Sequence, residues 1–163
     1  MRESLPTLLL TFTLAAACAE ESGDRAAVMK VIDAFFTGMT AKDIAGMQEI
    51  MTEDGVLYGY RESAEGPVAF SLTHAAYLGN LAASEGVPVE RIWDPEVNLH
   101  DRIAVVWTPY DFYSDGVFSH CGMNTFSMLK GEQGWKITGV VFSVKTENCE
   151  DSPLGPFEAT ESL

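Results

Sequence analysis

The segment that decides the fold spans residues 103–129 and reads IAVVWTPYDFYSDGVFSHCGMNTFSML. Its two halves are rich in β-branched and aromatic residues, which favour strands, and they meet at Asp115-Gly116. Asp-Gly in such a position is a strong signal for a two-residue type I′ turn. The segment therefore predicts a β-hairpin with strands at residues 103–113 and 117–129.

The turn sets the register of this hairpin by pairing Ser114 with Val117. Counting back from that pair places Asp111 opposite His120. Directly opposed side chains have Cβ atoms about 5 Å apart, so we expect a hydrogen bond between Asp111 and His120. One face of the hairpin would then carry Trp107, Asp111, Tyr113, Phe118, His120, Asn124, Phe126 and Met128.

This predicted face combines aromatic surface with an acid, an imidazole and an amide, which is typical of a small-molecule pocket. A carboxylate bonded to one ring nitrogen would fix the tautomer of His120 and raise its basicity, which suits proton abstraction next to a carbonyl. We therefore predict Asp111 and His120 as a catalytic acid–base pair. Trp107, Asn124 and Phe126 are predicted ligand contacts.

Two other interpretations of the hairpin remain open. Asp111 and His120 could form an exposed cross-strand ion pair, which stabilises a protein by less than about 1 kcal/mol. The opposite face could instead line the pocket, and it carries Val106, Tyr110, Phe112, Cys121, Met123 and Leu129.

The N-terminal half predicts helices. A first helix begins after the N-cap Asp24, because one apolar stripe of helical period follows it: Val28, Val31, Ile32, Phe35, Phe36 and Met39. Asp43 is expected to cap a second, short helix with Ile44, Met47, Ile50 and Met51 on its buried side. A third helix is predicted at residues 70–83.

The remaining segments predict strands. Asp54-Gly55 marks a turn, after which Val56, Tyr58 and Tyr60 alternate as a strand. Further strands are expected at residues 87–99, where a proline requires a bulge or an edge, and at residues 135–144. The order is helix, helix, strand, helix and then four strands, which predicts an α+β fold with helices packed on an antiparallel sheet.

Four motifs add a resemblance to this order: ERIWDPEV at residues 90–97, VWTPYDFY at 106–113, FSHCG at 118–122 and GWKI at 134–137. Together they resemble the secreted bacterial branch of the nuclear transport factor 2-like superfamily, which includes SnoaL-like and lumazine-binding proteins. The resemblance covers residues 24–149. It implies a cone in which three helices pack on a curved antiparallel sheet around a pocket, and a homodimer formed through the sheet.

The superfamily contains ketosteroid isomerases, polyketide cyclases, dehydratases and proteins that only bind, so the resemblance implies no single reaction. Our first interpretation is an exported domain that binds a small apolar or aromatic molecule without a cofactor. The alternative is a SnoaL-like or ketosteroid-isomerase-like enzyme using Asp111 and His120. The isomerase pattern needs two acids on the inner sheet, and only Asp111 is a candidate. A third reading is an adaptor whose pocket is filled by its own side chains.

Three further side chains are predicted ligand contacts. Tyr58 and Tyr60 could donate hydrogen bonds to an oxyanion, as a tyrosine does in ketosteroid isomerase. His74 lies on the apolar face of the third predicted helix, from which it could reach the pocket or serve as a core residue. His100 falls in a predicted turn and is expected on the surface.

The first residues are typical of an export signal. Residues 5–17 are uncharged and apolar over a length that suits a signal peptide and is too short to span a bilayer of about 30 Å. They end in Ala-Ala-Ala before Cys18, which resembles a bacterial lipobox. Residues 1–17 are therefore a predicted signal peptide, Cys18 a lipidation site and residues 18–23 a linker, in a periplasmic or outer-membrane lipoprotein. The alternative is ordinary cleavage next to Cys18 and secretion.

Export leaves Cys121 and Cys149 as an even pair in an oxidising compartment, which predicts a disulfide. Neither cysteine has a partner at zinc-site spacing, so we predict no metal site. Residues 150–163 form an acidic tail that is expected to be loop or disordered.

The chain is strongly acidic, with 24 Asp and Glu against 10 Lys and Arg and a net charge of −14. Such a charge repels polyanions, so nucleic acid is excluded as an expected partner. Contact with a membrane is expected only through a lipid anchor at Cys18.

Overall fold

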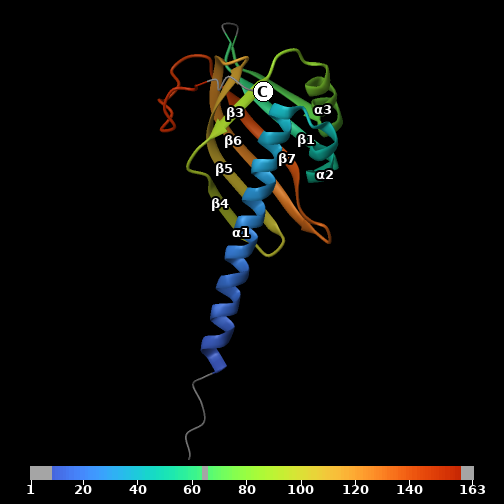
Figure 1. Ribbon diagram of the computed structural model, residues 1–163, viewed down its shortest axis with the longest axis vertical. Helices are drawn as coiled ribbons and strands as arrows, with labels where there is room; N and C mark the ends of the chain where they lie inside the picture. The colour runs from blue at the N-terminus through green and yellow to red at the C-terminus, as the bar shows by residue number, and fades with distance from the viewer. Residues whose placement is uncertain (1–8, 64–65, 159–163) are drawn as a thin grey trace, which may run out of the picture.

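The structure, a computed structural model, describes residues 9–63 and 66–158, with side chains from residue 21 onward. Its helices are α1 (Leu9–Ala41), α2 (Ile44–Ile50) and α3 (His74–Ala83). Its strands are β1 (Met51–Arg61), β2 (Val68–Thr73), β3 (Pro88–Ile92), β4 (Glu96–His100), β5 (Ile103–Ser114), β6 (Val117–Gly131) and β7 (Gly134–Val144). The helices pack on a curved sheet that wraps around α1, which confirms the predicted α+β class (Figure 1).

The strands form one sheet in the order β2-β1-β7-β6-β5-β3, and β4 pairs with the other half of β5. The predicted strand at residues 87–99 is thus two strands, β3 and β4, with Pro95 in the break between them. β1 and β7 pair in parallel, so the sheet is mixed and not antiparallel as predicted. Parallel neighbours need a long crossover, which the chain between β1 and β7 supplies.

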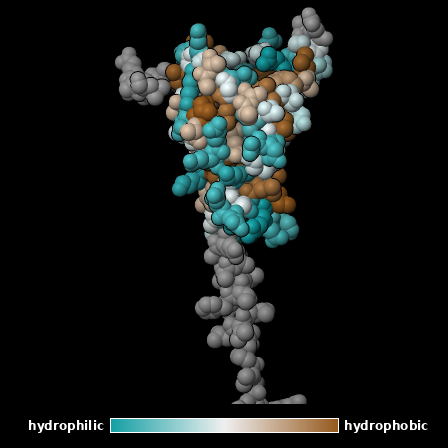
Figure 2. Space-filling view, turned by 90° about the vertical axis from the view of Figure 1, so that its right-hand side faces the viewer, coloured by the Kyte–Doolittle hydropathy of each residue, from teal (hydrophilic) through white to brown (hydrophobic). Residues whose placement is uncertain are grey.

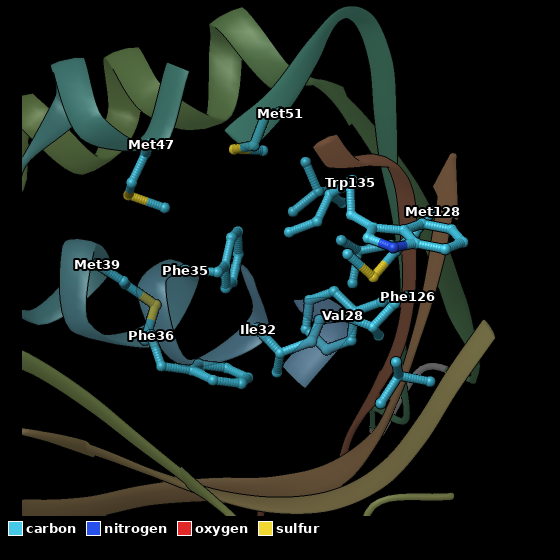
Figure 3. Packing of buried hydrophobic residues seen from close by; sticks show 14 of the residues in the cluster. Val28, Ile32, Phe35, Phe36, Met39, Met47, Met51, Phe126, Met128 and Trp135 are labelled. Atoms are coloured by element: carbon cyan, nitrogen blue, oxygen red, sulfur yellow. The ribbon is translucent and has the colours of Figure 1, made fainter. Parts of the chain in front are cut away.

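The apolar stripe of α1 fills the space inside the curved sheet, as predicted. Val28, Ile32 and Met39 are at most 4% exposed. Phe35 and Phe36 both meet the ring of Phe126 on β6 edge-on, at centroid distances of 5.5 and 5.7 Å (Figure 3). This contact joins the first helix to the middle of the sheet and forms the centre of the core.

The second predicted helix is confirmed, and the third begins four residues later than predicted. The Asp43 carboxylate accepts a hydrogen bond from the Gly46 amide at 3.0 Å and caps α2. Thr73 caps α3 by accepting from the Ala76 amide at 3.1 Å. Residues 68–73 pair with β1 as strand β2, so Phe70 lies in a strand and not in a helix.

The predicted turn at Asp54-Gly55 is wrong, because both residues lie within β1 near an irregularity in its pairing with β7. The glycine serves a different purpose there. A Cβ at Gly55 would lie 2.0 Å from Cε1 of His74, so the position must be glycine for the histidine ring to pack against the strand.

The predicted linker at residues 18–23 is also wrong, since α1 runs through it without a break. Alanine and glutamate there are good helix formers. The N-terminal part of α1 extends beyond the sheet (Figure 1). Residues 1–8 of the predicted signal peptide and the side chain of Cys18 lie outside the described part of the chain. Within that part, no helix has the length and apolar character needed to cross a membrane.

Cys121 and Cys149 form the predicted disulfide. Residues 150–158 contain no helix or strand and pack against β3 and β5. The ring of Phe157 lies 4.5 Å from that of Tyr113, and Arg91 donates a hydrogen bond to the Gly155 carbonyl at 3.1 Å. The side of the molecule that carries α2 and α3 shows only small hydrophobic patches among hydrophilic residues (Figure 2).

Candidate functional site

The hairpin of β5 and β6 turns at Asp115-Gly116 as predicted. Both residues have positive φ, 51° and 77°, as a type I′ turn requires, and Ser114 pairs with Val117. Beyond the next pair the register shifts, because Ser119 is an extra residue in β6 that forms a bulge.

The shift separates the predicted catalytic pair. Phe112, and not Asp111, pairs with His120, while Asp111 pairs with Cys121. Since successive side chains in a strand point to opposite faces, a shift of one residue moves every partner to the other face. Asp111 and His120 therefore lie on opposite sides of the sheet, and the predicted hydrogen bond between them is wrong.

Asp111 lies on the convex face, away from the helices, and is only 4% exposed. Its Oδ1 accepts a hydrogen bond from Nε of Arg91 at 2.9 Å, and its Oδ2 accepts from Nη2 of the same side chain. The Tyr113 hydroxyl also donates to Oδ2, at 3.4 Å. The carboxylate is thus fully engaged in an ion pair that holds β3 against β5.

The concave face combines β5 residues from one predicted face with β6 residues from the other. It encloses a cavity of about 140 Å³ between the sheet and helices α1 and α3. The lining residues are Phe35, Met39, Leu57, Tyr77, Glu90, Tyr110, Phe112, His120, Asn124, Phe126, Val140 and Phe142. Of the side chains predicted from the sequence, His120, Asn124 and Phe126 meet here.

Glu90 is the acid of this cavity, and the sequence analysis missed it. Nδ2 of Asn124 donates to its Oε1 at 2.6 Å, whereas Oε2 accepts no hydrogen bond from the described residues. Burial raises the pKa of Glu90 to about 7; the hydrogen bond from Asn124 opposes this shift, and the charge of Asp111 adds to it. In a strand, Glu90 and Ile92 point to one face and Arg91 points to the other. Because Ile92 is apolar, this alternation was the signal in the sequence that Glu90 faces the core.

His120 lies on the other side of Phe112 from Glu90. Phe112 pairs with Glu90 on β3 and with His120 on β6, so the two polar side chains are two strand spacings, or roughly 10 Å, apart. The His120 ring stacks on Phe112 at 4.7 Å, and its Nδ1 lies 3.0 Å from the Ser119 hydroxyl. Burial and then the positive charge of Arg61 lower the pKa of His120 to about 4, so the ring is neutral at pH 7.

Two tyrosines, Tyr77 and Tyr110, also line the cavity. The Tyr110 hydroxyl donates a hydrogen bond to the Ser143 carbonyl at 2.8 Å. The Tyr110 ring packs over Gly122, where a Cβ would lie 2.9 Å from its Cε1. Tyr77 stacks on Phe35 at a centroid distance of 6.0 Å. Burial and the charge of Glu90 raise the pKa of Tyr77, so this phenol stays protonated.

Four other predicted contacts lie elsewhere. Trp107, Tyr58 and Tyr60 are on the convex face and are 46%, 55% and 44% exposed. His74 is a core residue between α3 and β1: it is 2% exposed, and its Nδ1 lies 2.7 Å from the Thr52 carbonyl oxygen. Burial lowers the pKa of His74, while its hydrogen bond to Thr52 opposes this. The His100 side chain is 86% exposed, as expected.

The described residues contain no group of three or more His, Cys, Asp or Glu that could hold a metal ion. Besides the hydroxyl groups of Tyr77 and Tyr110, the polar side chains of the cavity lining are Glu90, Asn124 and His120.

Solved structures share this arrangement of helices around a curved sheet. An NTF2-like protein with a cystatin-like fold from Novosphingobium aromaticivorans matches with a TM-score of 0.65 and 14% identity, over 84% of this chain and 92% of that one. A nuclear transport factor 2-like superfamily protein from Salmonella enterica matches with a TM-score of 0.63 and 12% identity, over 79% and 96%. The chain has the nuclear transport factor 2-like fold. No family model and no curated protein matches it.

A third NTF2-like structure, a protein of unknown function from Silicibacter pomeroyi, has a TM-score of 0.57 and 16% identity, over 77% of this chain and 98% of that one. Sequence identities this low support a shared fold and do not support a shared function. The cavity of the present chain lies within its NTF2-like cone, so its chemistry has to be argued from its own side chains.

Proposed function

We propose that this NTF2-like protein binds a small, mainly apolar molecule with one aromatic ring in its concave cavity. The observation that carries the proposal is the lining: apolar and aromatic walls with Glu90, Asn124 and His120 as polar groups. The volume of about 140 Å³ suits one ring, since an apolar protein cavity of roughly 150 Å³ holds benzene. The free Oε2 of Glu90 and the ring of His120 would orient the ligand.

The proposal is tested by filling the cavity. Val140 is 3% exposed and lines it, whereas the next residue, Val141, is 54% exposed on the convex face. We expect Val140→Phe to weaken the binding of toluene and benzyl alcohol at least tenfold by ligand-detected NMR, and Val141→Phe to leave it unchanged. Near-UV circular dichroism checks that both variants are folded. Equal binding by the two variants, or none by the wild type, would contradict the proposal.

An acid–base enzyme is the second candidate, with Glu90 in the place predicted for Asp111. The favouring observation is the place of Glu90 in a mainly apolar cavity, where burial raises its pKa to about 7, the range suited to a general base near neutral pH. Glu90 would remove a proton next to a ketone to give the enolate, exchange that proton with solvent, and return a solvent-derived proton to the same carbon. We expect the wild type to speed deuterium incorporation into acetophenone in D₂O above the uncatalysed rate. The Glu90→Gln variant should lose this acceleration. Exchange at the uncatalysed rate in the wild type would exclude this candidate.

We also propose export, with a lipid anchor at Cys18. The disulfide between Cys121 and Cys149 supports export, because such bonds persist in oxidising compartments. Intact-mass measurement of the mature chain should give a lipidated N-terminus at Cys18, and Cys18→Ala should abolish membrane attachment. An unmodified mature chain in the soluble fraction would favour plain secretion.

A homodimer through the convex face is proposed as well. A row of cross-strand neighbours on β1, β7, β6 and β5 is partly exposed and mainly apolar, with one threonine: Tyr58, Val141, Thr125 and Trp107. Sedimentation should show a dimer that Trp107→Lys dissociates, while Leu154→Lys, on the exposed tail, does not. A monomeric wild type would overturn this proposal.

A further inference from the structure

The walls of the concave cavity are unusually aromatic. Six aromatic rings line it, and they come from both helices and sheet: Phe35, Tyr77, Tyr110, Phe112, Phe126 and Phe142. The face of an aromatic ring carries negative potential and attracts a cation within about 6 Å. A cavity with this lining offers a positive group contacts that a plain aliphatic cavity does not.

The acid in the cavity lacks a positively charged partner among the described residues. Glu90 is the only carboxylate among the described lining residues, and only one of its oxygens accepts a hydrogen bond, from Asn124. An ionised carboxylate has about four acceptor positions, so most of its capacity is unused. Glu90 is half-buried, so a positive hydrogen-bond donor at Oε2 would use this capacity and offset the cost of holding the charge partly away from water.

No cation of the chain serves this purpose among the described residues. The cavity lining contains neither Lys nor Arg. Arg91 lies on the convex side, bound to Asp111. Arg61 lies with its guanidinium 5.8 Å from the Phe70 ring, and among the described residues it makes no hydrogen bond or ion pair with Glu90.

We propose that the ligand of the cavity is a one-ring primary amine, whose ring packs on the aromatic walls and whose ammonium group donates to Oε2 of Glu90. This inference rests on the proposed binding function and names its ligand class. A neutral ring would gain only the apolar contacts, and an anionic ring would be repelled by Glu90. The net charge of −14 further favours the approach of cations.

The inference requires a particular pH dependence. The charged and titratable groups around Glu90 are Tyr77 from α3 and Tyr110 and Asp111 from β5, with Asn124 from β6 as its neutral partner. His120 from β6 lines the same cavity and stays neutral above about pH 5, because its pKa is lowered to about 4. Both phenols stay protonated, so Glu90 is the group of the cavity that changes charge near neutral pH. Since the amine pairs with ionised Glu90, its affinity should fall by up to about tenfold per unit as the pH drops below 7. A neutral ring should show no such loss.

The experiment compares benzylamine, benzyl alcohol and benzoate by calorimetric titration of the full chain. The variants are Glu90→Gln and the matched control Glu96→Gln, which removes the same charge from an exposed position on β4. We expect the wild type and Glu96→Gln to bind benzylamine at least about tenfold more tightly than benzyl alcohol. In Glu90→Gln this preference should vanish, while benzyl alcohol still binds.

The outcomes separate the two proposals. Binding of benzyl alcohol as tight as that of benzylamine in the wild type would overturn the amine inference and leave the binding function standing. Binding of none of the three compounds would overturn both. If Glu90→Gln fails to fold, the wild type decides: a loss of benzylamine affinity between pH 7 and pH 5 supports the inference, and a constant affinity overturns it.

Discussion

Phe112 and His120 are cross-strand neighbours whose rings stack 4.7 Å apart at an interplanar angle of 18°. This pairing exists because Ser119 bulges out of β6, and it places His120 inside the cone while Asp111 remains outside. Glu90, the other neighbour of Phe112, becomes the acid of the cavity in its place.

His120 should make the protein less stable in mild acid. Its pKa is lowered to about 4 by burial, whereas an unfolded histidine titrates near 6.5, so the unfolded chain binds more protons between these values. The free energy of unfolding therefore falls as the pH drops from about 6.5 to 4. We expect His120→Gln to reduce this loss in urea titrations at several pH values, and His100→Gln, at an exposed position, to retain it. Identical pH profiles for wild type and His120→Gln would contradict the prediction.

Glu90 should act in the opposite direction. Its pKa is raised by burial from 4.5 to about 7, so the folded chain binds more protons between these values. Neutral Glu90 is favoured in the folded protein, so its contribution to the free energy of unfolding is full below pH 4.5 and is lost as the pH rises through 7. Relative to wild type, Glu90→Gln should therefore gain free energy of unfolding between pH 4.5 and 7. Glu96→Gln serves as the control, and a gain of equal size in that variant would refute the assignment to Glu90.

The ion pair of Arg91 and Asp111 should stabilise the fold without contributing to ligand binding. Asp111→Asn leaves the partly buried guanidinium without a counter-charge, and removing one partner of a buried ion pair costs about 3 kcal/mol or more. We expect a loss of this size in the free energy of unfolding, but unchanged affinity for benzyl alcohol under native conditions. Asp101→Asn, at an exposed carboxylate, should change the stability by less than about 0.5 kcal/mol. A stable Asp111→Asn variant that no longer binds would instead support a site at Asp111.

The disulfide should hold the tail on the convex face. Cys149→Ser should lower the free energy of unfolding by about 3.5 kcal/mol in the chain-entropy model. Hydrogen exchange of residues 150–158 should become faster, because Phe157 and Gly155 would no longer be held next to Tyr113 and Arg91. A reducing agent should bring the wild type to the stability of the variant and leave the variant unchanged. Unaltered exchange in the reduced protein would show that the tail packs independently of the bond.

Local sequence determined much of the architecture. The stripe from Val28 to Met39 specified the C-terminal part of α1 and its buried face, because helical periodicity is a property of neighbouring turns. The predicted N-cap at Asp24 is wrong, since α1 begins at Leu9. Asp115-Gly116 specified the hairpin turn, since its backbone conformation depends on those two residues. The even number of cysteines that follow the predicted signal peptide correctly predicted the disulfide between Cys121 and Cys149.

Tertiary structure alone decided which side chains face the cavity. With the bulge at Ser119, Val106 and Phe126 share the concave face, and both are 0% exposed. Without it, Phe126 would share a face with Trp107, so burial against α1 selects the shifted register. The place of Glu90 follows from the same packing, and the parallel pairing of β1 with β7 joins segments far apart in the chain. Register and bulges depend on such long-range contacts, whereas turns and helical stripes are encoded within a few residues.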